Sequence, residues 1–233
     1  MAQGLFQRLE WMKLSPRRIL EAGCGVGADL AALTRRYPEA QVLGIDLAQS
    51  FLQSGREVGQ SAALVCADTL SLPLAKQSVD FIYANLLLPW CPNIVPVLKE
   101  WRRILRPQGL LLFSCLGPDS FKEWRDSKGA AFLPGLIDMH EIGDLLLATG
   151  FADPVLEVED ITLTYRSQKQ LQDELEKSGM QQSGHPLNDL SFPDNIYPVT
   201  FEVIYAHAWC PAETGFAADK QGTVKIPVSQ LKG

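Results

Sequence analysis

Three glycines at alternate positions, directly after a short apolar segment, constrain this chain more than any other feature. The segment is 19–22, and Gly23, Gly25 and Gly27 follow it. Glycine allows a sharp backbone turn and a close approach to a ligand, which a Cβ atom would prevent. The run therefore predicts a strand, a ligand-binding loop and a helix. Dinucleotide-binding loops space their glycines as G-x-G-x-x-G, so the spacing here favours a different ligand.

The pattern E-x-G-x-G-x-G, from Glu21 to Gly27, resembles the first motif of class I S-adenosylmethionine-dependent methyltransferases. The resemblance implies S-adenosylmethionine as the cofactor, which carries a sulfonium and an α-amino acid tail and has no phosphate. The carboxylate of Glu21 suits the ammonium group of that tail. A glycine-rich turn alone also fits an ordinary strand-to-helix connection, so the segments that follow decide between the two interpretations.

Acidic residues close two further apolar segments in register with the glycine loop. Asp46 comes about 20 residues after the loop, the spacing at which a second Rossmann-like strand ends. We expect Asp46 to bind both ribose hydroxyls of the cofactor and Asp68 to accept the adenine amino group. One acid at a strand end fits a helix cap, whereas three in register indicate a binding site. The residues expected to contact the cofactor are Glu21, Gly23, Cys24, Gly25, Gly27, Asp46, Leu47, Asp68, Thr69 and Asn85.

Strands alternate with helices along the sequence. The segments expected to form strands are 19–22, 41–47, 63–68, 78–85, 105–113, 154–158 and 199–209. Helical periodicity marks 29–37, 93–105 and 139–149, with Asn93 as an N-cap and Gly150 as a C-terminal stop. This alternation predicts an α/β fold with a Rossmann-like, seven-stranded, mostly parallel sheet and helices on both faces. We expect a single domain over residues 1–233 with ligands at the carboxyl ends of the strands.

Composition and spacing argue against several classes of protein. The 21 basic and 27 acidic residues give a net charge of −6, which disfavours a nucleic-acid partner. No apolar run approaches the about 18 residues of a membrane span and no signal-peptide segment is present, so we expect a cytoplasmic protein without a membrane partner. Five cysteines without C-x-x-C spacing fit a reducing compartment. We expect no metal, because Asp144 stands where an H-E-x-x-H motif beginning at His140 needs its second histidine.

Several segments resemble one family within this class, the malonyl-acyl carrier protein O-methyltransferases of biotin synthesis. They are 85–91, 100–107, 116–123, 137–144, 163–166 and 201–209. The resemblance implies methyl transfer to the free carboxylate of a malonyl thioester, carried by acyl carrier protein or coenzyme A. A carboxylate is already ionised at neutral pH, so we expect no catalytic acid or base. Rate would come from alignment of the reactants and exclusion of water.

Four side chains are expected near the substrate, in addition to Asn85. Trp90 and Tyr205 are placed near the transferred methyl group, although core packing explains two aromatic residues equally well. Arg102 and Arg106 are placed toward the acidic carrier protein, although solvated helix residues commonly carry such charges. The wider set of basic residues considered for docking is Arg102, Arg103, Arg106, Lys122, Arg125 and Lys128.

Two segments depart from the pattern of the family. Its members carry an N-terminal F-x-x-A-A-x-x-Y-D-like segment that folds over the cofactor, and we expect this lid to be missing here. Residues 160–198 are expected to form a shortened insertion near the substrate site, with a polar, proline-interrupted loop over 178–198. Two alternatives therefore stay open. One is a related non-methylating enzyme such as a protein arginine hydroxylase, and the other is a cofactor-binding assembly or interaction protein with little catalysis.

Overall fold

A computed structural model describes residues 1–57, 62–124, 135–180, 192, 194 and 196–212 of the chain. The strands are β1 Arg18–Ala22, β2 Gln41–Asp46, β3 Ala63–Cys66, β4 Val79–Asn85, β5 Leu105–Leu116, β6 Ala152–Tyr165 and β7 Tyr197–Trp209. The helices are α1 Ala2–Glu10, α2 Leu30–Arg36, α3 Gln49–Glu57, α4 Ile94–Ile104, α5 Met139–Ala148 and α6 Gln168–Lys177. Two short 3-10 turns, η1 Leu88–Trp90 and η2 Lys122–Trp124, complete the described elements.

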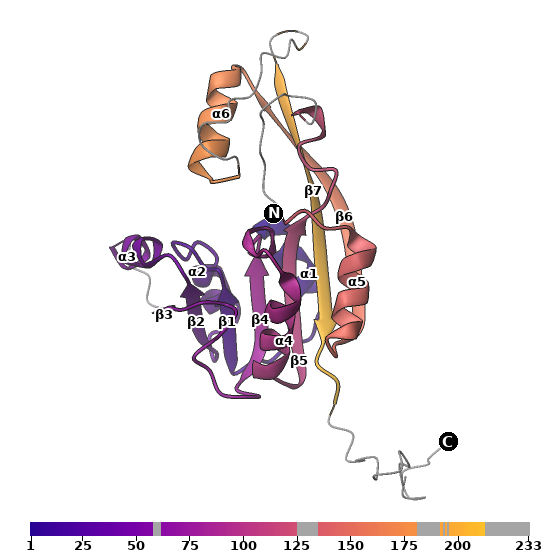
Figure 1. The fold of residues 1–233 in the computed structure, drawn as a ribbon. Coiled ribbons are helices and arrows are strands. Elements are labelled where there is room, and N and C mark those ends of the chain that lie inside the picture. Colours follow the sequence, from indigo (N-terminus) through magenta and orange to yellow (C-terminus); the bar gives the residue numbers. More distant parts are fainter. Residues whose placement is uncertain (58–61, 125–134, 181–191, 193, 195, 213–233) are drawn as a thin grey trace, which may run out of the picture.

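The strands form one seven-stranded sheet in the order β3-β2-β1-β4-β5-β7-β6 (Figure 1). β1 to β5 are parallel to one another, and β7 runs antiparallel to both of its neighbours. This arrangement confirms the predicted α/β class and the mostly parallel sheet. The chain order reverses between β1 and β4, and in such sheets ligands bind beyond the carboxyl ends of the strands at this point. The glycine loop follows β1 there.

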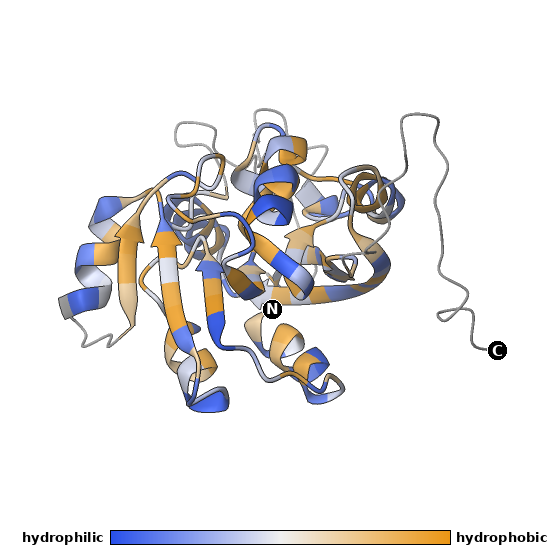
Figure 2. Cartoon of the chain, turned by 90° about the horizontal axis from the view of Figure 1, so that it is seen from below, coloured by the Kyte–Doolittle hydropathy of each residue, from blue (hydrophilic) through white to orange (hydrophobic). Residues whose placement is uncertain are grey.

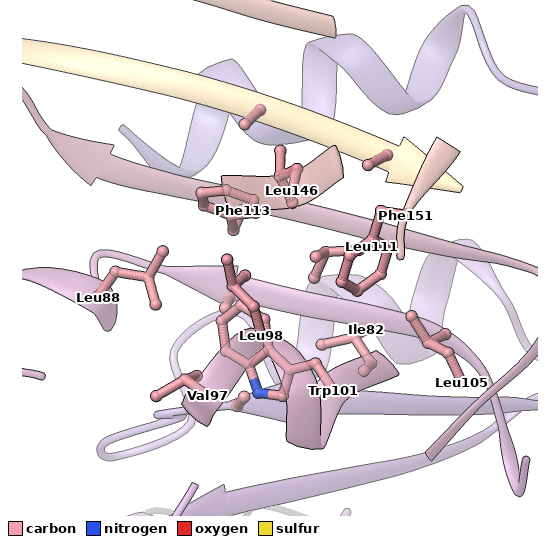
Figure 3. Close-up of a cluster of buried hydrophobic side chains, with 14 of the residues drawn as sticks. Ile82, Leu88, Val97, Leu98, Trp101, Leu105, Leu111, Phe113, Leu146 and Phe151 are labelled. Atoms are coloured by element: carbon pink, nitrogen blue, oxygen red, sulfur yellow. The ribbon is translucent and has the colours of Figure 1, made fainter. Parts of the chain in front are cut away.

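Helices cover both faces of the sheet, as the alternating pattern predicted. Apolar side chains of α1, α2 and α3 pack on one face and those of α4 and α5 on the other. On the face covered by α4 and α5, Trp101 and Leu98 of α4 face Ile82 of β4 and Phe113 of β5 (Figure 3). The strands carry mostly hydrophobic residues, whereas the helices carry both kinds (Figure 2). Each helix therefore buries one side against the sheet.

The ends of the helices follow the sequence signals closely. Asn93 caps α4 by accepting a hydrogen bond from the backbone N–H of Val95, at 3.0 Å. Gly150 adopts φ +90° directly after α5, a conformation that glycine reaches without strain. β6 is longer than the expected 154–158, because it pairs with β7 from Ala152 to Tyr165 while one side of the strand stays exposed. Most of the loop expected over 178–198 lies outside the described residues.

Candidate active site

The loop between β1 and α2 has the conformation that its glycines predict. Gly23, Gly25 and Gly27 have φ values of 70°, 54° and 82°, in the left-handed region that other residues rarely adopt. A Cβ atom on Gly23 would lie 2.8 Å from Cδ1 of Leu87. No atom lies within 4 Å of a Cβ built on Gly25, so the backbone at that position is open to a ligand.

Asp46 lies at the end of β2, beside this loop. Its Oδ2 accepts a hydrogen bond from the backbone N–H of Gly25 at 2.8 Å, and its Oδ1 accepts one from Ala48 at 2.8 Å. Asp46 therefore braces the glycine loop in addition to any contact with a ligand. Each carboxylate oxygen can accept more than one hydrogen bond, so these contacts leave capacity for ribose hydroxyls.

Three acids gather at this edge of the sheet. Glu21 is only 3% exposed, and its Oε2 has no hydrogen-bond partner. Burial, reinforced by the charges of Asp29 and Asp46, raises the pKa of Glu21 to about 9. None of the ion pairs found among the described residues involves these three acids. Glu21 is therefore protonated at neutral pH, and the unpaired charges of Asp29 and Asp46 give the edge a surplus of negative charge, which suits a cationic ligand.

A hydrogen-bonded chain connects the glycine loop to β4 and β5. The hydroxyl of Tyr83 donates to Oδ2 of Asp29 at 2.9 Å, and Nδ2 of Asn85 donates to the same oxygen at 3.2 Å. The hydroxyl of Ser114 in turn donates to Oδ1 of Asn85 at 2.8 Å. The sequence analysis expected Asn85 at the site and missed Asp29, Tyr83 and Ser114. Their positions carried a signal, because Asp29 directly follows the glycine motif and Tyr83 shares a strand face with Asn85.

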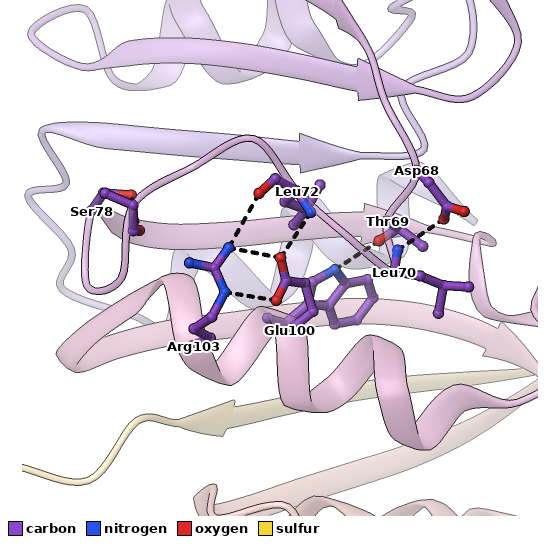
Figure 4. A network of polar contacts seen from close by, with 9 residues as sticks. Asp68, Thr69, Leu70, Leu72, Ser78, Glu100 and Arg103 are labelled. Atoms are coloured by element: carbon purple, nitrogen blue, oxygen red, sulfur yellow. Dashed lines mark hydrogen bonds and ion pairs between the residues drawn. The ribbon is translucent and has the colours of Figure 1, made fainter.

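The residues after β3 lie farther along the same edge. Oδ1 of Asp68 accepts a hydrogen bond from the backbone N–H of Leu70 at 2.9 Å (Figure 4). The hydroxyl of Thr69 accepts one from the indole of Trp101 at 3.0 Å. Leu47, expected beside the cofactor, is 68% exposed and so is free to pack on an apolar ring. The carboxyl edge therefore holds the predicted cofactor residues of β1, β2, β3 and β4 in one row.

The two aromatic residues expected near the substrate have different surroundings. Trp90 of η1 is 47% exposed, and its ring lies against Gly179, where a Cβ atom would come within 2.7 Å. Tyr205 is only 2% exposed. A side chain on Gly4 would collide with the Tyr205 ring, and the guanidinium of Arg8 lies 3.8 Å from its centroid. Helix α1 therefore covers Tyr205, whereas Trp90 stays half-exposed.

Arg102 and Arg106, also expected near the substrate, lie at the opposite edge of the sheet. Helix α4 runs back from the carboxyl edge, so its last turn carries Arg102 to the amino ends of the strands. Nε of Arg102 donates to the carbonyl oxygen of Gly150 at 2.9 Å, and Arg106 pairs with Asp80 at 2.8 Å. The structure therefore does not bring these arginines together with the glycine loop. Residue spacing alone could not show this, because it does not reveal the direction in which the helix runs.

Two of the other basic residues considered for docking have local partners. Arg103 pairs with Glu100 at 2.7 Å (Figure 4), and Lys122 pairs with Asp160 at 2.8 Å. Arg125 and Lys128 lie outside the described residues. The members of this set that the structure describes are thus paired locally rather than gathered on one face.

Metal or thiol chemistry finds no support within the described ranges. No group of three or more His, Cys, Asp or Glu residues in the part of the chain that the structure describes is placed to hold a metal ion. Burial raises the pKa of Cys91 to about 11, so its thiol is a poor nucleophile. No helix among the described residues has the length and apolar character needed to cross a membrane. The arrangement instead suits the binding of a cationic small molecule.

The chain is similar in sequence to known methyltransferases. A family model described as "Methyltransferase domain" matches residues 20–113. A malonyl-[acyl-carrier protein] O-methyltransferase of Laribacter hongkongensis is 39% identical over 236 residues, covering 88% of this chain and 80% of the relative. The crystal structure of YcgJ from Bacillus subtilis superposes with a TM-score of 0.67 at 14% identity, covering 91% and 99% of the two chains.

A second solved structure carries the cofactor expected here. Phosphoethanolamine N-methyltransferase 2 of Haemonchus contortus, in complex with S-adenosyl-L-methionine, has a TM-score of 0.58 at 14% identity. The match covers 90% of this chain and 52% of that protein. At this level of identity the two structures are similar in fold.

Proposed function

Because this chain belongs to the family of malonyl-[acyl-carrier protein] O-methyltransferases, we propose that it methylates the free carboxylate of a malonyl group held on acyl carrier protein. The chain is a carboxyl O-methyltransferase of biotin synthesis by family. The proposals that go beyond the family concern its cofactor, its carrier and the residues that contact them. We propose S-adenosylmethionine as the cofactor, acyl carrier protein as the partner, and the cytoplasm as the location.

The observation that carries the cofactor proposal is the glycine loop with its surrounding acids. The backbone of Gly25 is open, and the buried Oε2 of Glu21 has no partner. A ligand with positive charge would compensate the charges of Asp29 and Asp46, whereas a phosphate would be repelled. We propose that Asp46 binds the ribose hydroxyls and that Asp68 faces the adenine amino group. When bound, S-adenosylmethionine supplies an electrophilic methyl group on a sulfonium.

The reaction requires the protein to align the two reactants rather than to transfer a proton. The malonyl carboxylate is ionised at neutral pH and attacks without a general base. The residues of this chain would hold the two reactants in line and exclude water from the reacting atoms. We propose that Trp90 contributes to this exclusion, because it is half-exposed beside η1 and packs on Gly179 at the end of α6. Helix α6, which belongs to segment 160–198, would then lie beside the substrate entrance of a single domain.

Calorimetric titration tests the cofactor first. We expect the wild-type chain to bind S-adenosylmethionine and S-adenosylhomocysteine, and Asp46→Ala to weaken both by at least about tenfold, because hydrogen bonds to a charged group are lost. Asp144→Ala on the exposed face of α5 serves as a matched control that keeps wild-type affinity. The wild-type chain should then transfer methyl to malonyl-acyl carrier protein. Cofactor binding without transfer to either malonyl thioester would contradict the proposed substrate, and no cofactor binding would contradict the site.

A further inference from the structure

The carboxylate of Asp29 is held by two donors at one of its oxygens. Tyr83 and Asn85 both donate to Oδ2, and Oδ1 accepts none of the hydrogen bonds found among the described residues. Burial and the charge of Asp29 raise the pKa of the Tyr83 hydroxyl, so this group stays a neutral donor. The contacts therefore fix the rotamer of Asp29 and leave an acceptor for something else.

The amide of Asn85 is fixed in the same way. The hydroxyl of Ser114 accepts a hydrogen bond from the backbone N–H of Leu86 at 3.1 Å and donates to Oδ1 of Asn85. Because Oδ1 is the acceptor there, Nδ2 must face Asp29, and one N–H of that amide remains for a ligand. Ser114 is completely buried, so no ligand reaches it directly. Its effect on a ligand passes through Asn85.

The strand order places this network at one end of the proposed cofactor. Asp68 follows β3, Asp46 ends β2 and the glycine loop follows β1, with β4 next in the sheet. If adenine lies at Asp68 and ribose at Asp46, the amino-acid end extends across the loop toward β4. Asp29 and Asn85 lie there. Glu21 is 3% exposed, whereas Asp29 is only partly buried, so Asp29 is the acid that a ligand can touch.

We propose that Asp29 contacts the ammonium of the cofactor's amino-acid end, and that Tyr83 and Ser114 are positioning residues that aim Asp29 and Asn85 at that end. This inference rests on the proposed cofactor. It moves the role expected for Glu21 to Asp29 and assigns a function to two buried hydroxyls that touch no ligand themselves. Burial and the charges of Asp29 and Asp46 raise the pKa of Glu21 to about 9, so Glu21 stays protonated at neutral pH and the negative charge that faces the ligand is that of Asp29.

Binding of three related ligands tests this assignment. S-adenosylmethionine and S-adenosylhomocysteine both carry the amino-acid end, and 5′-methylthioadenosine lacks it. We expect Tyr83→Phe and Asp29→Asn each to raise the dissociation constants of the first two by about tenfold and to leave that of 5′-methylthioadenosine unchanged. Tyr37→Phe, on the same face of the sheet but near the amino edge, should change none of them. In steady-state assays the KM for S-adenosylmethionine should rise more than kcat falls.

The controls separate this inference from the proposed function. Tyr83→Phe keeps the ring that packs 5.5 Å from Phe6, and retained binding of 5′-methylthioadenosine shows that a variant is folded. Ser114→Ala provides a second removal of the network that leaves Tyr83 intact, with the same pattern expected. Equal weakening of all three ligands, or unchanged affinity for the first two, would overturn the inference. Failure of the wild-type chain to bind S-adenosylmethionine would instead overturn the proposed function.

Discussion

The two edges of the sheet carry similar residues in opposite arrangements. Toward the amino edge two acids meet bases: Asp80 pairs with Arg106, and Glu100 pairs with Arg103. At the carboxyl edge Glu21, Asp29 and Asp46 meet none of the basic side chains in the described ion pairs. Charges that satisfy one another stabilise the fold, whereas charges left unsatisfied are available to a ligand. The difference separates an edge whose charges stabilise the fold from the edge that we propose for binding.

The first way to test this comparison is to break the amino edge. Asp80 accepts hydrogen bonds from the backbone N–H groups of Arg17 and Arg18 and from the guanidinium of Arg106. Asp80→Ala leaves these donors without their acceptor, and we expect it to lower the free energy of unfolding by about 3 kcal/mol. Urea unfolding followed by circular dichroism measures this change.

Asp80→Asn is the matched variant, because its amide oxygen can still accept hydrogen bonds from the backbone. We expect it to lose about half as much stability as Asp80→Ala. Both variants should bind S-adenosylmethionine as the wild-type chain does. Loss of cofactor affinity in a variant that remains folded would mean that the two edges are not separate in function.

At the carboxyl edge we expect the opposite effect, because removal of an acid there should raise the stability of the fold. The folded chain holds the proton of Glu21 up to about pH 9, against an ordinary pKa of 4.5, so its contribution to stability is present at low pH and is lost as the pH rises toward 9. Glu21→Gln mimics the protonated form and removes this loss. We expect the cofactor-free variant to gain stability relative to wild type by about 1.4 kcal/mol for each pH unit from about pH 5 toward pH 8.5.

Thermal or urea unfolding across this pH range measures the effect, and Glu39→Gln on the surface is the control for the same chemical change. A constant difference between Glu21→Gln and wild type from about pH 5 to 8.5 would contradict the proton linkage. A greater stability of the variant would show that the site keeps a carboxyl group at a cost to the cofactor-free fold.

The smallest effect is expected where a charge pair lies in solvent. Lys122 and Asp160 are 2.8 Å apart with side chains 45% and 50% exposed. Asp160 raises the pKa of Lys122, but exposed pairs are screened by water and salt. We expect Lys122→Met to leave the urea midpoint unchanged within error. A clear destabilisation, absent at high salt, would show that pairing matters at exposed positions too.

Much of the fold could be predicted from local patterns. The glycine loop, the strands ending near Asp46 and Asn85, and the cap at Asn93 are each specified by neighbouring residues, so they follow from sequence alone. The extent of β6 could not be predicted, because its pairing with β7 rather than its own alternation sets its length.

The site could be predicted less completely than the fold. Asp46 and Asn85 were found from strand ends, but the roles of Tyr83 and Ser114 depend on contacts between strands that are distant in sequence. Arg102 and Arg106 were expected near the substrate because the sequence of a basic cluster does not show at which edge of the sheet it lies. The orientation of α4 relative to the sheet decides on which edge they lie.

The first helix has a consequence beyond covering the sheet. Phe6 of α1 packs on the ring of Tyr83, and the hydroxyl of that ring holds Asp29 in the cofactor loop. If ordering of the loop stabilises α1, then ordering of α1 stabilises the loop by the same free energy. We therefore expect a ligand that tightens the loop to make the opening of α1 less favourable and to protect its backbone amides from solvent exchange. Hydrogen exchange of α1 with and without the ligand measures this coupling between the beginning of the chain and its glycine loop.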